Sequence, residues 1–287
     1  MTGSVLAFEE EGRGQRLVCM PGGPGFPPAY MNGLREMSGS RTFTLLHPRG
    51  TGHSEAPADR DAYRMEDYVA DIELTRSRLG VERLDLLGHS HGGVVAAHYA
   101  AAHPDRVNAL ILLNTPAYGG PRAEERAAEF FASRAGDPSV AEALAALHKP
   151  DDDAFSSPRE LGLRIAEILP LWLARPAEAG PDWAALSDGL TVNPDSLLFF
   201  NEEVFPSLDL ARIAGSIACP TLVLTGDLDP YAGPEHANEL AALIPHVRVQ
   251  VLPGVGHMSQ VDAPRPVHRA VLNFLDTLDD TPERTQS

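Results

Sequence analysis

A serine between two glycines, in GHSHG at residues 88–92, is the part of this sequence best suited to chemistry. The pattern of glycine, any residue, serine, any residue and glycine is typical of a sharp turn from a strand to a helix, where the serine can act as a nucleophile. Here LDLL precedes the turn as a predicted strand, and HGGVVAAHYAAAH follows Ser90 as a predicted helix. The start of that helix would place free N–H groups beside Ser90, which favours the negative charge that develops in acyl transfer.

A serine hydroxyl is a poor nucleophile until a histidine accepts its proton and a carboxylate orients that histidine. Of the eleven histidines, His257 in LPGVGHMSQ lies in a glycine-containing turn after a predicted strand, where a side chain can project over the sheet edge. We therefore predict that His257 is the base. His89 and His91 flank Ser90, but neighbours in a tight turn point away from it, so we expect their side chains in or behind the walls of the site.

The carboxylate is predicted in VLTGDLDP, residues 223–230, where two aspartates come just after a strand. Either one could simply form the turn. We predict Asp229, three residues after Gly226, as the acid that orients His257, with Asp227 as the alternative.

Stabilising the negative oxygen of an acyl-transfer intermediate needs two backbone donors. The N–H of His91 comes directly after Ser90 and is predicted to be one of them. The second is expected from the glycine- and proline-rich loop CMPGGPGFPP, residues 19–28, with Gly23 as the first choice and Gly22 next. The alternative is that this loop is only a rigid turn.

The elements that must position these residues read as an α/β pattern. Runs rich in leucine and valine, with little polar alternation, predict buried and mostly parallel strands with helices on both faces. Predicted strands cover residues 4–10, 16–20, 42–47, 83–88, 109–114, 220–226 and 247–254. Predicted helices cover residues 27–37, 65–80, 91–103, 123–135, 157–174 and 266–278.

Strand signals nearly vanish between about residues 117 and 211 and then return. We therefore predict two parts of one α/β core, residues 1–116 and 212–279, interrupted by a helical cap. The cap covers residues 117–211 and is expected after the sixth strand. Residues 280–287 are expected to form a flexible polar tail.

Composition excludes several classes of protein. The 287-residue chain has a formal net charge of −17, and no dense cluster of Lys and Arg, so a nucleic-acid partner is not expected. No apolar run approaches the roughly 20 residues that a membrane-spanning helix needs. The N-terminal residues lack the basic and apolar regions of a signal peptide, which predicts a cytoplasmic location. Cys19 and Cys219 lie in apolar runs, so we expect two buried thiols rather than a disulfide or a cysteine metal site.

Five motifs resemble, in the same order, the signature of α/β-hydrolase-fold proteins of the prolyl iminopeptidase-like group. They are PGGPG (21–25), HPRGTGHS (47–54), GHSHGG (88–93), GDLD (226–229) and GVGH (254–257). The resemblance spans the whole predicted core and implies the α/β-hydrolase fold, with the chain order Ser90, Asp229, His257. It implies a serine hydrolase that works through an acyl-enzyme, with neither a cofactor nor a metal.

The sequence departs from this signature at two places. Pro21 stands where the group has a histidine, and His47 with Pro48 stands where it has aspartate and glutamine. Neither departure removes a member of the predicted catalytic set. Arg49, which follows, reads as a structural residue of its turn.

The resemblance leaves the substrate open. Peptidases of the group hold the free amino terminus of a short peptide with cap glutamates, and Glu202 or Glu203 in FFNEEVFP, residues 199–206, could do so. Pro230 replaces an acid that related enzymes sometimes carry, which weakens that reading. Four aromatic residues of the cap could line a pocket or form its core: Trp172, Trp183, Phe199 and Phe200.

Three functions follow from these features. The first is a prolyl aminopeptidase-like hydrolase, and the second a carboxylic-ester or lactone hydrolase acting on a small metabolite. The third, of another class, is a non-hydrolytic biosynthetic or ligand-binding protein on the same fold.

Overall fold

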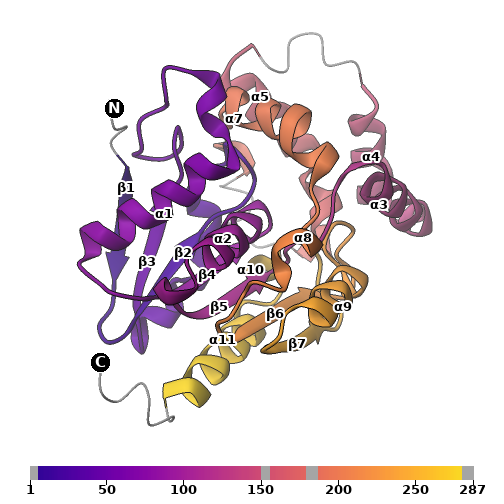
Figure 1. The fold of residues 1–287 in the computed structure, drawn as a ribbon. Helices are drawn as coiled ribbons and strands as arrows, with labels where there is room; N and C mark the ends of the chain where they lie inside the picture. The colour runs from indigo at the N-terminus through magenta and orange to yellow at the C-terminus, as the bar shows by residue number, and fades with distance from the viewer. Residues whose placement is uncertain (1–5, 150–155, 179–186, 280–287) are drawn as a thin grey trace.

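Seven strands form one sheet in the computed structural model, which describes residues 6–149, 156–178 and 187–279 (Figure 1). The strands are β1 (Ala7–Glu11), β2 (Arg16–Met20), β3 (Thr42–His47), β4 (Leu84–His89), β5 (Val107–Leu113), β6 (Thr221–Gly226) and β7 (Val247–Leu252). Their order is β1-β3-β2-β4-β5-β6-β7, with β1 antiparallel to β3 and every other neighbouring pair parallel. The prediction of a mostly parallel sheet is confirmed.

Helices cover both faces of this sheet. One face carries α1 (Met65–Leu79), α2 (His91–Ala102) and α9 (Pro234–Leu243), and the other carries the 3-10 segment η1 (Pro28–Gly39) and α11 (Pro264–Asp279). Shorter segments connect them: η2 (Arg60–Tyr63), η3 (Pro104–Arg106) and α10 (Ser259–Asp262). α9 is not among the helices predicted from the sequence.

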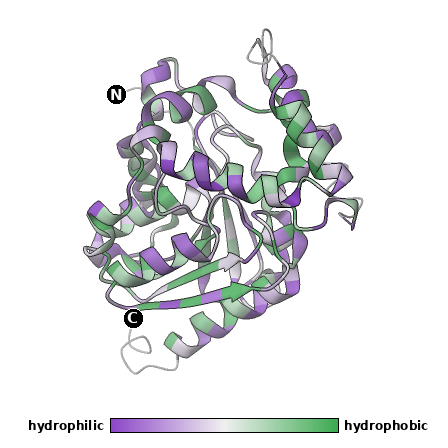
Figure 2. Ribbon diagram, turned by 90° about the vertical axis from the view of Figure 1, so that its right-hand side faces the viewer, coloured by the Kyte–Doolittle hydropathy of each residue, from purple (hydrophilic) through white to green (hydrophobic). Residues whose placement is uncertain are grey.

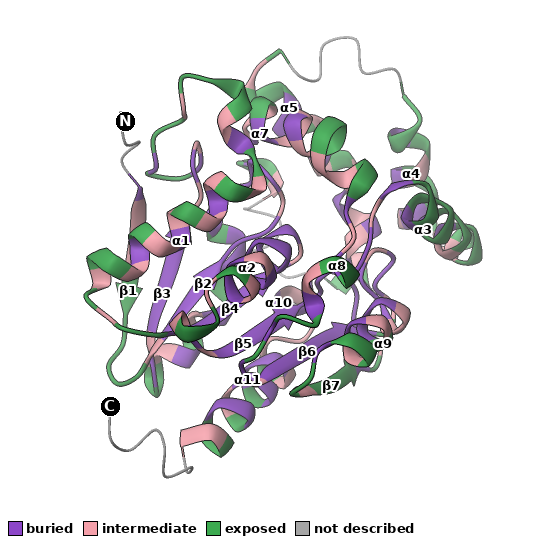
Figure 3. Ribbon diagram, viewed as in Figure 1, coloured by how far each residue is buried: buried purple, intermediate pink, exposed green. Residues whose placement is uncertain are grey.

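Two apolar layers result from the alternation of side chains along each strand. Leu86 and Leu110 pack with α1 and α2, whereas Leu87 and Ile111 pack with η1 and α11. Figure 2 shows the strands mostly in the colour of apolar residues, and Figure 3 shows that the central strands are buried while the edge strand β7 is largely exposed. The central strands, whose ends carry the predicted site, are therefore held from both sides.

In the described part of the chain, the helical segments between β5 and β6 are α3 (Gly120–Arg134), α4 (Pro138–Leu147), α5 (Pro158–Ile168), η4 (Leu169–Trp172), η5 (Pro176–Glu178), α7 (Pro194–Phe199), the π-helical η6 (Phe200–Val204), η7 (Phe205–Ser207) and α8 (Ala211–Ala214). All but α8 lie within the predicted cap region. In Figure 1 the helices α3, α4, α5 and α7 gather to one side of the sheet. The described residues of this region contain no strand, only an isolated bridge between Tyr118 and Asp209.

This bridge closes the neck of the cap. Gly119 donates its N–H to the Leu208 carbonyl at 2.9 Å, and Leu210 donates to Ala117 at 2.8 Å. The chain therefore enters and leaves the cap side by side.

The prediction that the cap follows the sixth strand is wrong for the described residues. Five strands, β1 to β5, precede the cap there, because only one strand, β1, comes before the parallel strands begin at β2. The boundaries at 116/117 and 211/212 stay predictions. The predicted flexible tail, residues 280–287, lies outside the described residues. No helix in the described part of the chain combines the length and apolar character needed to cross a membrane.

The helix after Ser90 packs unusually close to the sheet. A β-carbon on Gly92 would overlap the backbone carbonyls of Met20 and Pro21, and one on Gly93 would overlap the hydroxyl of Thr115. Only glycine lets α2 approach β2 and β5 this closely.

We expect Gly93→Ala to lower the free energy of unfolding by about 1–3 kcal/mol, because the added methyl group has no space in a packed region. Urea denaturation of the variant and the wild type measures the change. Gly215→Ala is the matched control, since Gly215 has a helical φ of −65° and no atom lies within 4 Å of the place its methyl group would take. An unchanged stability of Gly93→Ala would contradict the close packing.

Candidate active site

Ser90 occupies a strained turn between β4 and α2. Its φ of 53° and ψ of −123° are unusual for a residue with a side chain, and such a conformation costs about 1–3 kcal/mol. The turn is fixed by three backbone hydrogen bonds: the Ser90 N–H donates to Leu113 at 2.9 Å, and the Ser90 carbonyl accepts from Gly93 at 2.9 Å and Val94 at 3.2 Å. The hydroxyl is thereby presented at the carboxyl edge of the sheet.

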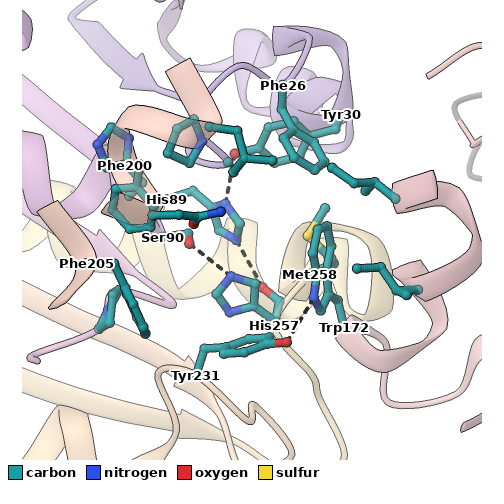
Figure 4. Close-up of a pocket in the computed structure, with 18 of the residues that line it drawn as sticks. Phe26, Tyr30, His89, Ser90, Trp172, Phe200, Phe205, Tyr231, His257 and Met258 are labelled. Atoms are coloured by element: carbon teal, nitrogen blue, oxygen red, sulfur yellow. Dashed lines mark hydrogen bonds between the residues drawn. The ribbon is translucent and has the colours of Figure 1, made fainter. Parts of the chain in front are cut away.

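His257 lies in the loop after β7, with its ring against Ser90 (Figure 4). Its Nε2 is 3.0 Å from the Ser90 Oγ, and its Nδ1 is 3.0 Å from each carboxylate oxygen of Asp229. The arrangement fits a proton on Nδ1, held by Asp229, and a free lone pair on Nε2 that can accept the serine proton.

Asp229 lies in the turn after β6 and its side chain is fully shielded from solvent. Its Oδ1 accepts the N–H of Tyr231 at 2.8 Å and that of Ala232 at 3.0 Å. Burial raises the pKa of this carboxyl group, but the charge of a protonated His257 and the hydrogen bonds outweigh burial, so the pKa lies below its usual value. Asp229 therefore stays ionised beside His257.

Asp227, the alternative acid, has a different task. Its Oδ1 accepts the N–H of Gly254 at 2.6 Å and that of Val255 at 3.3 Å. It thus shapes the loop that leads to His257 and makes no hydrogen bond to the imidazole.

Asn114, to which the sequence reasoning gave no role, supports the acid. It directly follows β5 and has a φ of 46°, and its Nδ2 donates to Asp229 Oδ2 at 2.8 Å and to the Gly256 carbonyl at 3.2 Å. Its Oδ1 accepts the hydroxyl of Ser259 at 2.5 Å. The sequence does carry a signal for this role: Asn114 is a polar residue directly after a buried strand, at the sheet edge where the carboxyl ends of parallel strands form sites.

Two backbone N–H groups near Ser90 are candidates for binding a negative oxygen. The His91 N–H is the first of α2 and so has no helical carbonyl to bond. The Gly23 N–H has no hydrogen-bond partner among the described residues, and both residues line the cavity next to Ser90. Gly22, the alternative to Gly23, is excluded as a donor because its N–H binds the Tyr30 hydroxyl at 2.5 Å.

A cavity of about 380 Å³ opens above Ser90, between core and cap. Its core side includes Phe26, Tyr231 and Met258. Its cap side is mainly apolar and is formed by Tyr118, Ala123, Leu147, Leu161, Arg164, Ile165, Ile168, Trp172, Leu197, Phe200, Asn201 and Phe205. None of the described residues that line it is acidic.

Of the predicted substrate-binding residues, Trp172 and Phe200 line this cavity. Phe199 does not, because it faces the apolar layer with α1 and α2 and is 8% exposed. Trp183 lies outside the described residues.

The prediction that Glu202 or Glu203 lies in the pocket is wrong. Both side chains are exposed, and Glu202 pairs with Arg60 at 2.8 Å on the surface. The physical reason is the π-helical turn η6, which directs Phe200 and Asn201 to the cavity and the glutamates to solvent.

The imidazole of His91 is a wall of the site, as expected. It packs edge-on against Tyr68 and Phe200, with ring centroids 5.2 and 5.0 Å away. Burial, and to a smaller extent a charge on His98, lowers the pKa of His91 to about 3, so its ring is neutral.

The loop that carries His257 is tied to the cap by Asp262. One carboxylate oxygen, Oδ2, accepts the N–H of Gly256 at 2.8 Å and that of Ala174 at 3.0 Å. Gly256 precedes His257, and Ala174 lies in the cap region just after η4. The carboxylate therefore fixes the distance between base and cap.

A second tie lies beside the first. Trp172 accepts the Met258 N–H at its carbonyl, at 3.2 Å, and donates its indole N–H to the Tyr231 hydroxyl at 3.3 Å (Figure 4). The cap residue Trp172 thus binds both the residue after His257 and the turn after β6 that carries Asp229.

The motif around His47 is structural. Arg49 makes two hydrogen bonds to the Asp71 carboxylate, at 2.8 and 2.7 Å, and donates to two backbone carbonyls, which agrees with the predicted structural role.

Glu9, His47 and His53 form the one group of three in the described residues close enough to hold a metal ion. His47 Nδ1, however, accepts the backbone N–H of His53 at 2.9 Å, so a neutral His47 carries its proton on Nε2, the atom that faces Glu9 at 3.2 Å. That nitrogen has no lone pair for a metal, and the hydrogen-bonding pattern favours pairing with Glu9 instead.

Comparisons with known proteins agree with the fold. The model of the alpha/beta hydrolase fold family matches residues 15–264. The proline iminopeptidase of Heyndrickxia coagulans is 23% identical over 282 residues, which covers 96% of this chain and 95% of that protein.

Two solved structures show the same architecture. The proline iminopeptidase of Mycobacterium smegmatis has a TM-score of 0.75 at 22% identity, over 96% of this chain and 99% of that one. The enol-lactonase of Burkholderia xenovorans LB400 has a TM-score of 0.73 at 25% identity, over 96% and 98%. The predicted resemblance is confirmed, and the choice between substrates rests on the cavity.

We expect Asp262→Ala to destabilise the protein by about 1–3 kcal/mol, because the buried N–H groups of Gly256 and Ala174 lose their acceptor. Asp262→Asn should cost less, since its amide oxygen can still accept both. Urea denaturation of the two variants against the wild type gives the comparison. Equal losses for both variants would show that the shared acceptor is unimportant.

Proposed function

Because the chain belongs to the alpha/beta hydrolase fold family, we propose that it is a serine hydrolase that forms an acyl-enzyme at Ser90. The observation that carries the proposal is the chain of contacts at 3.0 Å from Ser90 Oγ through His257 to the buried Asp229. A hydroxyl, a neutral imidazole and a carboxylate in this order are what nucleophilic acyl transfer requires.

In the proposed mechanism Ser90 Oγ attacks the carbonyl carbon of the substrate while His257 Nε2 takes the hydroxyl proton. The carbonyl oxygen becomes negative and accepts hydrogen bonds from the N–H groups of Gly23 and His91. His257 then protonates the leaving group, and the acyl-enzyme forms. A water molecule, deprotonated by His257, attacks the acyl-enzyme, and His257 returns this proton to Ser90 Oγ as the acid is released. Asp229 keeps the imidazole in the required tautomer and stabilises its positive form.

The proposed substrate is a carboxylic ester or a lactone with a largely apolar body. The cavity supports this because its cap side is lined mainly by aliphatic and aromatic side chains, and no acidic one among the described residues. A free amino terminus entering it would lose hydration without gaining a carboxylate partner. An uncharged ester avoids that cost.

A prolyl aminopeptidase-like activity is the second candidate. It is favoured by the similarity to the proline iminopeptidase of Heyndrickxia coagulans along 96% of the chain. It would need an amine-binding group other than Glu202 and Glu203. The cytoplasmic location and the lack of a nucleic-acid partner stay predictions from the sequence.

We expect a fluorophosphonate probe to label the folded protein at Ser90, because the probe reacts with a serine that a histidine activates. Peptide mass mapping locates the label. Ser90→Ala should take up none, and Asp229→Asn should lower the rate of hydrolysis of p-nitrophenyl butyrate by ~10⁴-fold. A folded wild type that neither reacts with the probe nor turns over activated esters would instead favour a ligand-binding or biosynthetic protein.

We expect p-nitrophenyl butyrate to be a better substrate than proline p-nitroanilide, and the free and N-acetylated forms of the anilide to be cleaved at similar rates. The reason is the lack of an acidic side chain among the described residues that line the cavity. Initial rates over a range of concentrations give kcat/KM for each. The double variant Glu202→Gln, Glu203→Gln is the control and should match the wild type. A strong preference for the free amine, lost in this variant, would reverse the choice of substrate.

A further inference from the structure

His89, the residue before Ser90, is one of the most buried polar groups of the site, at 2% exposed. Both of its ring nitrogens are hydrogen-bonded: Nδ1 lies 2.9 Å from the Tyr30 hydroxyl, and Nε2 lies 3.0 Å from the backbone carbonyl of His257. Figure 4 shows His89 between these two partners, next to the contact of Ser90 with His257. The proposed mechanism gives this imidazole no task.

The partners fix the proton of His89. A carbonyl oxygen can only accept, so Nε2 must carry the hydrogen that binds His257. Burial, followed by the charge that His257 can carry, lowers the pKa of His89 to about 3, so the ring holds a single proton. Nδ1 is then an acceptor, and the Tyr30 hydroxyl must donate to it.

Tyr30 extends this chain to the loop of residues 19–28, called here the oxyanion loop because it carries Gly23. Its hydroxyl oxygen accepts the Gly22 N–H at 2.5 Å while its hydrogen goes to His89. Tyr30 is 5% exposed, and burial raises the pKa of its hydroxyl well above the usual value, so it stays protonated. Each hydrogen bond of the chain therefore has one direction, from the Gly22 N–H to the Tyr30 hydroxyl, from Tyr30 to His89, and from His89 to the His257 carbonyl.

The two ends of this chain lie in two different loops of the proposed site. Gly22 precedes Gly23, the proposed oxyanion donor, and His257 is the proposed base. Gly22 also lies so near the turn that a β-carbon there would meet the His89 carbonyl and the Ser90 side chain. A shift of either end would move a donor or a base relative to Ser90.

We propose that His89 is a positioning residue that sets the oxyanion loop and His257 at fixed places on either side of Ser90 by bonding Tyr30 with Nδ1 and the His257 carbonyl with Nε2. The proposal rests on the serine hydrolase function above. It explains why an imidazole stands here: few side chains place an acceptor and a donor at opposite ends of one rigid ring.

Two substitutions test the two hydrogen bonds of the imidazole one at a time. In His89→Asn the amide oxygen takes the place of Nδ1, so the bond from Tyr30 is kept and the donor to His257 is lost. In His89→Gln the amide nitrogen takes the place of Nε2, so the donor to His257 is kept and the acceptor for Tyr30 is lost. Each should lower kcat for p-nitrophenyl butyrate by about tenfold or more, with KM changed less than threefold, because misplaced groups weaken the transition state more than substrate binding.

Tyr30→Phe tests the coupling. Alone, and on the His89→Asn background, it should lower kcat about tenfold. On the His89→Gln background its effect should be clearly smaller than tenfold, because the bond to His89 is already gone and only the bond from the Gly22 N–H is left to lose. A residue that only fills space would not give this selective loss of additivity.

His268→Gln is the matched control. The Nε2 of His268 also binds a backbone carbonyl, that of Gly33 at 2.7 Å, but it does not line the cavity. It should leave kcat within twofold of the wild type even where the melting temperature falls.

A second measurement needs no substrate. The ¹⁵N chemical shifts of histidine-labelled wild type, with the His89 signals identified by their loss in His89→Gln, should report a neutral ring protonated at Nε2. Protonation at Nδ1, or effects of Tyr30→Phe and His89→Gln on kcat that simply multiply, would overturn the positioning role. If the wild type fails to hydrolyse esters while the shifts match, it is the proposed function that fails and the hydrogen-bonded chain that stands.

Discussion

The backbone of Ser90 is held at a positive φ at the point where β4, α2 and the oxyanion loop meet. This conformation is unfavourable by itself, and it persists because bonds to Leu113, Gly93 and Val94 fix the turn on both sides. The close approach of α2 to β2 and β5 completes the restraint, and it requires glycine at residues 92 and 93. Once this turn is set, the direction of the Ser90 hydroxyl and of the His91 N–H follow together, since they belong to adjacent residues.

Charge burial decides how the rest of the site is built. A carboxylate with no exposed surface is costly unless its oxygens are bonded. Asp229 meets this condition with the ring of His257, the amide of Asn114 and the backbone of the turn after β6. These donors stabilise the ionised form and also hold the carboxylate in place, so the same bonds that make its burial tolerable orient the imidazole. His89 shows the opposite solution, since burial keeps it neutral and its two nitrogens take different roles.

The sequence allowed the sheet, its helices and the residues now found around Ser90 to be predicted, because they depend on local patterns and on motifs at strand ends. Ser90, His257 and Asp229 each follow a predicted strand, and parallel strands bring their carboxyl ends to one edge. Glu202 and Glu203 were beyond such reasoning. A π-helical turn changes the direction of side chains relative to an α-helix, and no local pattern announced it.

Other features depend on contacts between distant segments. The sequence alone does not show which of Gly22 and Gly23 has a free N–H group. The structure distinguishes them because the Gly22 N–H is bonded to the Tyr30 hydroxyl. Asn114 reads as the polar end of a strand until Asp229 is placed beside it. The role of His89 needs three partners from separate parts of the chain, so a histidine next to a nucleophile could be read only as a wall.

The cap and the proposed base are mechanically linked, and this bears on how a substrate would be selected. Asp262 bonds the residue before His257 and a cap residue with one oxygen, and Trp172 contacts both Met258 and Tyr231. Trp172 also lines the cavity, so a substrate body that packs against it presses on the same segment that holds the base. Because the cavity is mainly apolar on its cap side, that packing is driven by burial of apolar surface rather than by a charged anchor. A substrate of the right shape would then be favoured by the same contacts that keep His257 in line with Ser90.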